Sequence, residues 1–407
     1  MRTMKEQTVA TLPSPNPPDI ASGLPVIRLL ALTLSSFIAT ANETVPAGLL
    51  PQIADGFRVS EALAGQWVTL CALGSGLGAI PLTFATRNHG RRSLLLLSIA
   101  LFFICNALTA LSSSYGLILL ARFIVGLATG MAWSLMAGCA RRMVGTSLQG
   151  RALALAMLGI PLALSLGVPL SAWLTRLVEW RVIFGLLSAM SLLLMIWVWL
   201  GVPEAPAEQQ VARPSLRKVL STPGVRPVLC VVWMWIMAHY TLYTYIAPFL
   251  ESVDPGIALE QVLLVFGLSA MLGVWLVGLL VDRWLRVLVV ISLGTFALVA
   301  LGLGLRGTSQ AVLYIGVALW GLSFSGAPTL LQTALADAAG DGAEEAQSML
   351  VTVFNLAYAG SGIVGAVVLE TLGATALPWT LVAWLLAGLL IAWRARRHAF
   401  PPVRRTV

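Results

Sequence analysis

Charged residues are scarce in this chain. Asp, Glu, Lys and Arg make up 10% of its 407 residues, whereas a water-soluble domain carries about 25%. Apolar residues make up 58%, and the mean hydropathy is +0.89. This excess of apolar side chains must face lipid, and no polar segment is long enough to form a water-soluble enzyme domain. The composition therefore predicts a membrane protein with many spans, and no enzyme.

Cysteine and histidine are scarce as well, with four and three residues. The cysteines all lie in apolar runs and show no metal-ligand spacing, so we interpret them as small buried hydrophobic residues. No metal or other cofactor is expected. The lack of a cluster of acids and histidines near a membrane interface also argues against an integral membrane enzyme.

Twelve apolar stretches are long enough to cross a membrane as helices, each of which needs about 20 residues. The chain is therefore predicted to be an all-α integral membrane protein with 12 transmembrane helices. The predicted spans are 27–53, 62–85, 93–113, 116–140, 149–176, 180–202, 225–251, 258–282, 285–305, 309–335, 346–370 and 374–394.

A polar segment after the sixth span divides the chain into two halves. The stretches that begin at Gly76 and Gly273 resemble each other, since each contains an apolar helix, a short basic loop and another apolar helix. Two pseudo-symmetric six-helix bundles are typical of transporters, because alternating access needs two bundles that rock about a central site. The predicted divisions are a disordered cytoplasmic tail (1–24), an N-terminal bundle (25–202), a cytoplasmic linker (203–224), a C-terminal bundle (225–396) and a cytoplasmic tail (397–407).

The distribution of Lys and Arg predicts the orientation of the spans. With both termini in the cytoplasm, twenty of these residues lie in cytoplasmic segments and four in outer loops. Cytoplasmic loops of membrane proteins carry such an excess. The pattern predicts a multi-pass protein of a bacterial-type inner membrane, and it explains the net charge of +8 without a nucleic-acid partner.

Three titratable side chains are predicted to lie within the membrane: Glu43, Arg122 and His239. Glu43 is near the middle of its span, where a charge costs about 2.5 kcal/mol or more. It either stays protonated and holds a neighbouring helix, or it takes and releases a proton as its solvation changes, with the proton as coupling ion. It could also attract a cationic substrate. Arg122 either extends to the outer interface or acts as the cationic partner of Glu43.

Polar and aromatic residues on several spans predict a cavity face for a small-molecule substrate. Rings and neutral amides suit hydroxyl groups and ring faces, whereas a polyanion would need several cations. The predicted cavity residues are Asn42, His239, Tyr240, Tyr243, Trp320, Asn355 and Tyr358.

The fifth span contains helix breakers, among them Gly159, Gly167 and Pro169. Breakers inside a span need a structural reason. They indicate either a packed kink or a pliable gate helix between the two halves.

Several motifs resemble the major facilitator superfamily, in particular its twelve-span drug:proton antiporter branch and the sugar-efflux and purine-nucleoside-efflux members. They are "ETVPAGLLPQIADGFRVS" with Glu43, "ARFIVGLATG" with Arg122 and Gly126, and "LALSLGVPLSA" with Gly167 and Pro169. The resemblance implies proton transfer for Glu43 and Arg122, and a monomer. It also implies conformational roles for Gly126 and for two loops, which contain Arg87, Gly90 and Arg91, and Gly278, Asp282 and Arg283. Thr86 stands where the family places an acid.

The expected function is proton-coupled efflux of small neutral or weakly basic organic compounds such as sugars, nucleosides or drugs. Its partners are the substrate and the lipid bilayer. Two alternatives stay open at this point: uptake by proton symport, and a membrane sensor that transports nothing.

Overall fold

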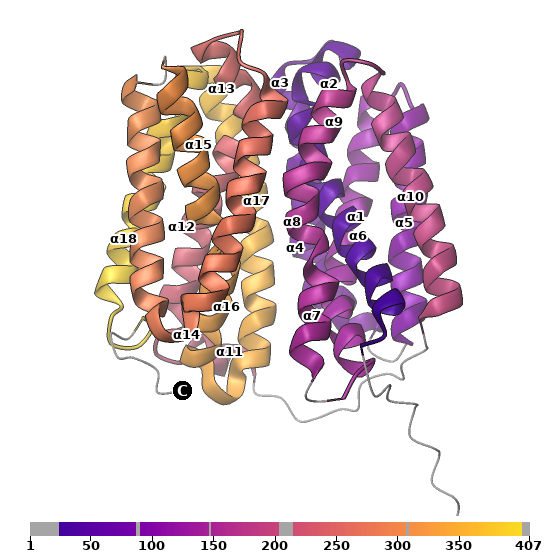
Figure 1. Ribbon diagram of the computed structural model, residues 1–407, viewed down its shortest axis with the longest axis vertical. Coiled ribbons are helices and arrows are strands. Elements are labelled where there is room, and N and C mark those ends of the chain that lie inside the picture. Colours follow the sequence, from indigo (N-terminus) through magenta and orange to yellow (C-terminus); the bar gives the residue numbers. More distant parts are fainter. Residues whose placement is uncertain (1–23, 87–89, 146–147, 203–214, 307–308, 401–407) are drawn as a thin grey trace, which may run out of the picture.

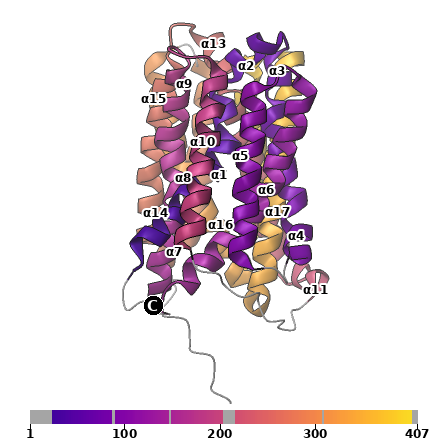
Figure 2. The same cartoon turned by 90° about the vertical axis from the view of Figure 1, so that its right-hand side faces the viewer.

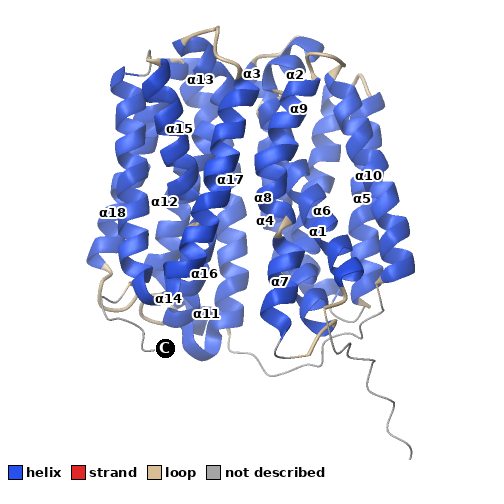
Figure 3. Cartoon of the chain, in the orientation of Figure 1, coloured by secondary structure: helices blue, strands red, loops and turns tan. Residues whose placement is uncertain are grey.

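The computed structural model describes residues 24–86, 90–145, 148–202, 215–306 and 309–400. Regular structure in these ranges is helical, as Figure 3 shows. Most of the two predicted tails and of the predicted linker, together with Arg87, lie outside the described residues. The predicted division into tails, linker and bundles therefore stays a prediction.

The first half of the chain forms helices that lie on one side of the molecule (Figure 1). They are α1 (Val26–Gly48), α2 (Leu50–Phe57), α3 (Glu61–Ala64), α4 (Gln66–Thr86), α5 (Arg91–Leu111), α6 (Tyr115–Arg142), α7 (Gln149–Met157), α8 (Gly159–Leu162), the π-helical segment Ala163–Gly167, α9 (Val168–Leu174) and α10 (Trp180–Gly201).

The second half forms the helices on the other side. They are α11 (Leu216–Leu220), α12 (Val225–Thr244), α13 (Ile246–Val253), α14 (Leu259–Arg306), α15 (Gln310–Phe324), α16 (Ala327–Ala339), α17 (Ala343–Leu372) and α18 (Leu377–Arg394), with short 3-10 turns at Gly340–Gly342 and Ala374–Ala376.

Ten helical runs in the described ranges are long and apolar enough to cross a membrane. One of them, α14, consists of two spans joined at Trp284, which has φ −130° and ψ 23°. The 21-residue helix α4 accounts for the second predicted span. Every predicted span thus overlaps a described helix or helical run, and the prediction of an all-α membrane protein is confirmed.

The helices run between two ends of the molecule (Figure 2). We call the end with α2, α3 and α13 the α13 end, and the opposite one, with α11, the α11 end. The halves meet where α4 packs against α17 and where α9 and the π-helical segment pack against α14. Gly76 of α4 permits this approach, because an added Cβ would lie 3.1 Å from the Cβ of Asn355.

Candidate functional site

Proline 46 shapes the part of α1 that carries Glu43. Proline has no N–H, so the carbonyl four residues earlier, that of Asn42, lacks its usual helical donor. The Nη2 of Arg122 on α6 donates to this carbonyl oxygen at 2.8 Å. Two residues beyond the proline α1 ends, and a new helix begins at Leu50. The predicted first span is therefore two helices, and its break follows from the sequence.

Arg122 is fully buried. Its guanidinium carbon lies 5.5 Å from the centre of the Phe184 ring. Its Nε and Nη1 atoms have no hydrogen-bond partner among the described residues. The side chain does not extend to a membrane interface, and no ion pair joins it to Glu43 in the described part of the chain. In this conformation the hydrogen bond to the Asn42 carbonyl holds the Arg122 guanidinium beside the backbone of the residue that precedes Glu43.

The carboxyl group of Glu43 lies inside the molecule. The residue keeps some exposed surface, but its Oε1 atom is buried without a hydrogen-bond partner in the described ranges. The side chain of Trp133 on α6 interacts with the carboxyl. A buried carboxylate with so few partners is costly when ionised. The site therefore favours the neutral acid in this conformation.

Tyr358 on α17 connects Glu43 to the second half of the chain. Its hydroxyl donates to the backbone carbonyl of Glu43 at 3.1 Å. Its ring stacks on that of Tyr240 from α12, with centroids 3.5 Å apart and planes 21° apart. Two backbone carbonyls in the turn before Pro46 thus accept hydrogen bonds from other helices: that of Asn42 from Arg122, and that of Glu43 from Tyr358.

An aromatic cluster surrounds His239 in the second half. The indole N–H of Trp320 donates to His239 Nδ1 at 3.0 Å, which places the proton of a neutral imidazole on Nε2. Phe324 stacks on the imidazole with centroids 3.4 Å apart, so no ligand fits between these two rings. Tyr243 stacks on the imidazole with centroids 5.4 Å apart, and its buried hydroxyl has no hydrogen-bond partner in the described residues.

The structure brings five of the seven predicted cavity residues together in this cluster or on its edge: His239, Tyr240, Tyr243, Trp320 and Tyr358. The two asparagines differ from them. Asn42 donates to the Ile38 carbonyl of its own helix at 3.0 Å, and its Oδ1 is buried without a partner among the residues described. Asn355 donates to Val351 of its own helix at 2.9 Å, at the contact with α4.

Sequence reasoning missed Trp133, Phe266 and Phe324. Phe324 follows Trp320 by four residues, so helical periodicity could have placed both rings on one face. Phe266 packs 4.7 Å from Trp320 between ring centroids. Trp133 and Phe266 come from other helices, and no local signal connects them to Glu43 or His239.

The predicted conformational residues occupy several kinds of position. A Cβ on Gly126 would collide with the Cys71 carbonyl of α4, and one on Gly159 with the Thr33 carbonyl of α1, so both are close-packing positions. Gly167 ends the π-helical segment and Pro169 follows in α9. Because Pro169 cannot bond the Ser165 carbonyl, a widened turn at this place is expected. This segment also packs against α14 of the other half.

The described residues of the two predicted basic loops lie toward the α11 end (Figure 1). Gly90 precedes α5 and Arg91 begins it. Gly278, Asp282 and Arg283 belong to α14, and the last two lie just before the bend at Trp284. The side chains of Asp282 and Arg283 are exposed.

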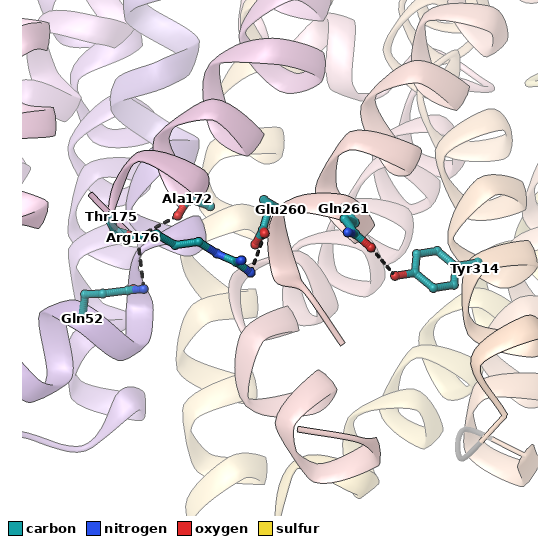
Figure 4. Close-up of polar contacts among 7 residues, drawn as sticks. All are labelled: Gln52, Ala172, Thr175, Arg176, Glu260, Gln261 and Tyr314. Atoms are coloured by element: carbon teal, nitrogen blue, oxygen red, sulfur yellow. Dashed lines mark hydrogen bonds and ion pairs between the residues drawn. The ribbon is translucent and has the colours of Figure 1, made fainter. Parts of the chain in front are cut away.

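Polar contacts join the halves at the α13 end. Figure 4 shows Arg176, just beyond α9, extending to Glu260 of α14, with Nη2 and Oε1 2.5 Å apart. Ser60 donates to Glu370 at 3.1 Å, and the buried hydroxyl of Tyr245 lies 3.5 Å from the Ala62 carbonyl oxygen of α3. The α13 end is therefore closed by contacts between the two halves.

Comparisons with known proteins agree with this architecture. The chain is 28% identical to a "Probable sugar efflux transporter" of Helicobacter pylori over 86% of this chain and 90% of that protein. It is 29% identical to the "Purine ribonucleoside efflux pump NepI" of Escherichia coli over 82% and 85%. It is also 31% identical to the "Transcription regulatory protein OpdE" of Pseudomonas aeruginosa over 91% and 94%.

The fold is also that of a solved transporter. A crystal structure of a D-xylose-proton symporter superposes with a TM-score of 0.74 at 17% identity, covering 93% of this chain and 98% of that one. At this identity the likeness concerns the fold alone. The sequence profile of the Major Facilitator Superfamily matches residues 32–366. This chain therefore belongs to the Major Facilitator Superfamily of membrane transporters.

Proposed function

We propose that this chain exports small neutral or weakly basic organic compounds, such as sugars, nucleosides or drugs, in exchange for protons. The arrangement at Glu43 carries this proposal. Its Oε1 atom is buried without a partner among the described residues, and its backbone is bonded by Tyr358, which stacks on Tyr240. A change of charge at Glu43 therefore acts on a residue of the aromatic cluster.

The closed α13 end gives the proposed cycle its direction. Glu43 takes a proton when the molecule is open at the α13 end and keeps it while that end is closed, because burial penalises the carboxylate. Opening at the α11 end admits water to Glu43, and the proton leaves there. The substrate moves from the α11 end to the α13 end. Each time the α13 end closes, the proton bound to Glu43 can leave only at the α11 end.

The proposed substrate class follows from the aromatic cluster. Sugar faces and nucleobases stack on aromatic rings, and the buried Tyr243 hydroxyl supplies a polar contact for a ligand hydroxyl. Arg122 already bonds the Asn42 carbonyl, so it is poorly placed to hold a polyanion. These features support neutral or weakly basic compounds.

The proposed setting is a bacterial-type inner membrane with the α11 end in the cytoplasm. Both ends of the described chain lie toward the α11 end (Figure 1), where Arg141, Arg142, Arg217 and Lys218 also lie. An excess of basic residues marks the cytoplasmic side. We further propose that the protein acts as a monomer, with the proton as its only coupling ion and no nucleic-acid partner.

Reconstituted vesicles test this proposal. The wild type and Glu43→Gln are sealed in vesicles with an internal pH dye and an imposed pH gradient, and a panel of sugars, nucleosides and antibiotics is added. At least one compound should drive proton flux in the wild type, and Glu43→Gln should abolish it. Glu179→Gln, which neutralises an exposed acid beside α10, is the matched control and should transport normally.

Other outcomes identify the alternatives. Substrate and proton moving in the same direction would replace export by uptake. A sensor is a second candidate because one relative carries the name of a regulatory protein. Binding of panel compounds without flux of substrate or proton would favour it over transport.

A further inference from the structure

A basic cavity of about 390 Å³ lies at the α11 end of the second half, apart from Glu43 and the aromatic cluster. Residues 221–227, before and within the first turn of α12, form one wall. Residues 394–399, at the end of α18 and beyond it, form the other. The cavity therefore lies between two segments that are remote in sequence.

Positive charge dominates the lining of this cavity. Arg226, Arg394, Arg397 and His398 line it, together with small and neutral residues and no carboxylate. Arg394 and Arg397 are exposed, and Arg226 uses its Nε to donate to the Leu220 carbonyl at 2.9 Å. Asp337 of the adjacent helix α16 is not part of the lining. The cavity thus presents several guanidinium groups to one space.

The backbone around the cavity is firmly held. Gly224 has φ +99°, and a Cβ added there would lie 2.6 Å from the His398 carbonyl oxygen, so this close approach requires glycine. Arg286 of α14 donates to the Phe400 carbonyl at 2.9 Å. Ala399 and Phe400 are buried. The segment after α18 is therefore packed in place, and the cavity is preformed.

Large apolar residues flank the cavity on the surface. Leu390 and Trp393 on α18 are 45% and 60% exposed, and Leu216 and Leu220 on α11 are also exposed. In a membrane protein such residues face acyl chains. The cations therefore lie beside a lipid-facing surface, at the level where lipid headgroups are found.

We propose that this cavity binds a phosphate-bearing anion. Guanidinium groups bind phosphate with paired, charge-assisted hydrogen bonds, and basic pockets beside transmembrane helices accept anionic headgroups. Two sources share this chemistry: the headgroup of an anionic phospholipid, and a free phosphate ester. The site is separate from the transport pathway and does not depend on the proposed function.

Binding measurements on the purified full chain in neutral detergent test this proposal. The probes are a short-chain phosphatidylglycerol, the phosphatidylcholine with the same chains, and glycerol 3-phosphate. The double variant Arg394→Gln, Arg397→Gln removes two exposed cations from the lining. The control, Arg217→Gln, Lys218→Gln, removes two exposed cations of α11 that do not line the cavity.

We expect phosphatidylglycerol to bind the wild type and the control alike, and the cavity variant about 25-fold more weakly, since each of the two removed cations contributes about a fivefold factor near a lipid surface. Binding of phosphatidylglycerol alone supports a lipid headgroup, and binding of glycerol 3-phosphate as well supports a free ester. Equal weakening in both double variants, equal affinity for phosphatidylcholine, or no binding of any probe would overturn the proposal.

Discussion

The two halves of the candidate site use different chemistry. Around Glu43 the interactions are few, buried and directed at the main chain, with Arg122 and Tyr358 each bonding one carbonyl. Around His239 the contacts are mostly ring against ring, with one hydrogen bond from Trp320. Hydrogen bonds to a backbone fix one geometry, whereas ring stacks tolerate different partners. We therefore expect the first half to couple transport to protons and the second half to recognise the substrate.

The largest expected effect is at Arg122. Arg122→Gln removes the charged donor to the Asn42 carbonyl, and loss of a charged hydrogen bond costs about 1.5–3 kcal/mol. We expect a lower thermal unfolding temperature in detergent and loss of pH-driven flux for every substrate. Arg151→Gln, which changes an exposed arginine of α7, should leave both unchanged. Loss of pH-driven flux for only some substrates would show that Arg122 takes part in substrate recognition, and it would contradict the division of roles between the two halves.

A moderate effect is expected at Tyr358, where the two regions meet. Tyr358→Phe keeps the stack on Tyr240 but removes the bond to the Glu43 carbonyl, which costs about 0.5–1.5 kcal/mol. Proton flux should fall severalfold while the order of preference among substrates stays the same. Tyr314→Phe removes a hydroxyl that bonds Gln261 at the α13 end, and it serves as the control. A changed order of preference among substrates in Tyr358→Phe would show that the Tyr358 hydroxyl also takes part in substrate recognition.

At Trp320 we expect a change in substrate affinity without a change in proton coupling. Trp320→Phe keeps a ring but removes the donor to His239 Nδ1, so the apparent affinity should change for some substrates by roughly fivefold, equivalent to about 1 kcal/mol. The number of protons moved per substrate should stay constant. Flux measured over a concentration series of each substrate separates these quantities, and a changed proton count would contradict the division between the halves.

A pH-dependent effect is expected at Glu61 of α3. Burial, then repulsion from Glu251 of α13 and Asp55 of α2, raises its pKa to about 7 from 4.5. Since the closed α13 end holds the proton more tightly, closure gains stability as pH falls from above 7 toward 4.5 and loses it as pH rises through 7. Spin labels at Ser113 and Ser252, both exposed, should report wider distances at pH 8 than at pH 5.5. Glu61→Gln should remove this difference, and its persistence would exclude Glu61 as the cause.

The smallest effect is expected at Arg176. Its side chain is 58% exposed in the ion pair with Glu260, and exposed pairs contribute about 0.2–1 kcal/mol. Arg176→Gln should widen the distribution of the same spin-label distances slightly, without loss of flux. A fully open α13 end in this variant would show that the ion pair, and not the helix packing, keeps the halves together.

Much of the fold was predictable because its causes are local. Apolar length predicted the spans, and Gly167 and Pro169 predicted an irregular helix where the π-helical segment occurs. Glu43 and Arg122 could be singled out because a charge within an apolar run is rare. The bond from Tyr358 to Glu43 spans 315 residues, and no periodicity or motif predicts the register of α17 against α1. The stack of Phe324 on His239 likewise depends on tertiary packing.

Arg122 and Tyr358 both donate hydrogen bonds to peptide oxygens of α1, and every amino acid has a peptide oxygen. Replacing the side chain at position 42 or 43 therefore leaves the acceptors of Arg122 and Tyr358 in place, as long as Pro46 keeps the Asn42 carbonyl unpaired. The acid can be exchanged without rebuilding its surroundings. Under the proposed coupling role, one substitution at position 43 would therefore change the ion dependence of transport and leave the hydrogen bonds to the two carbonyls in place.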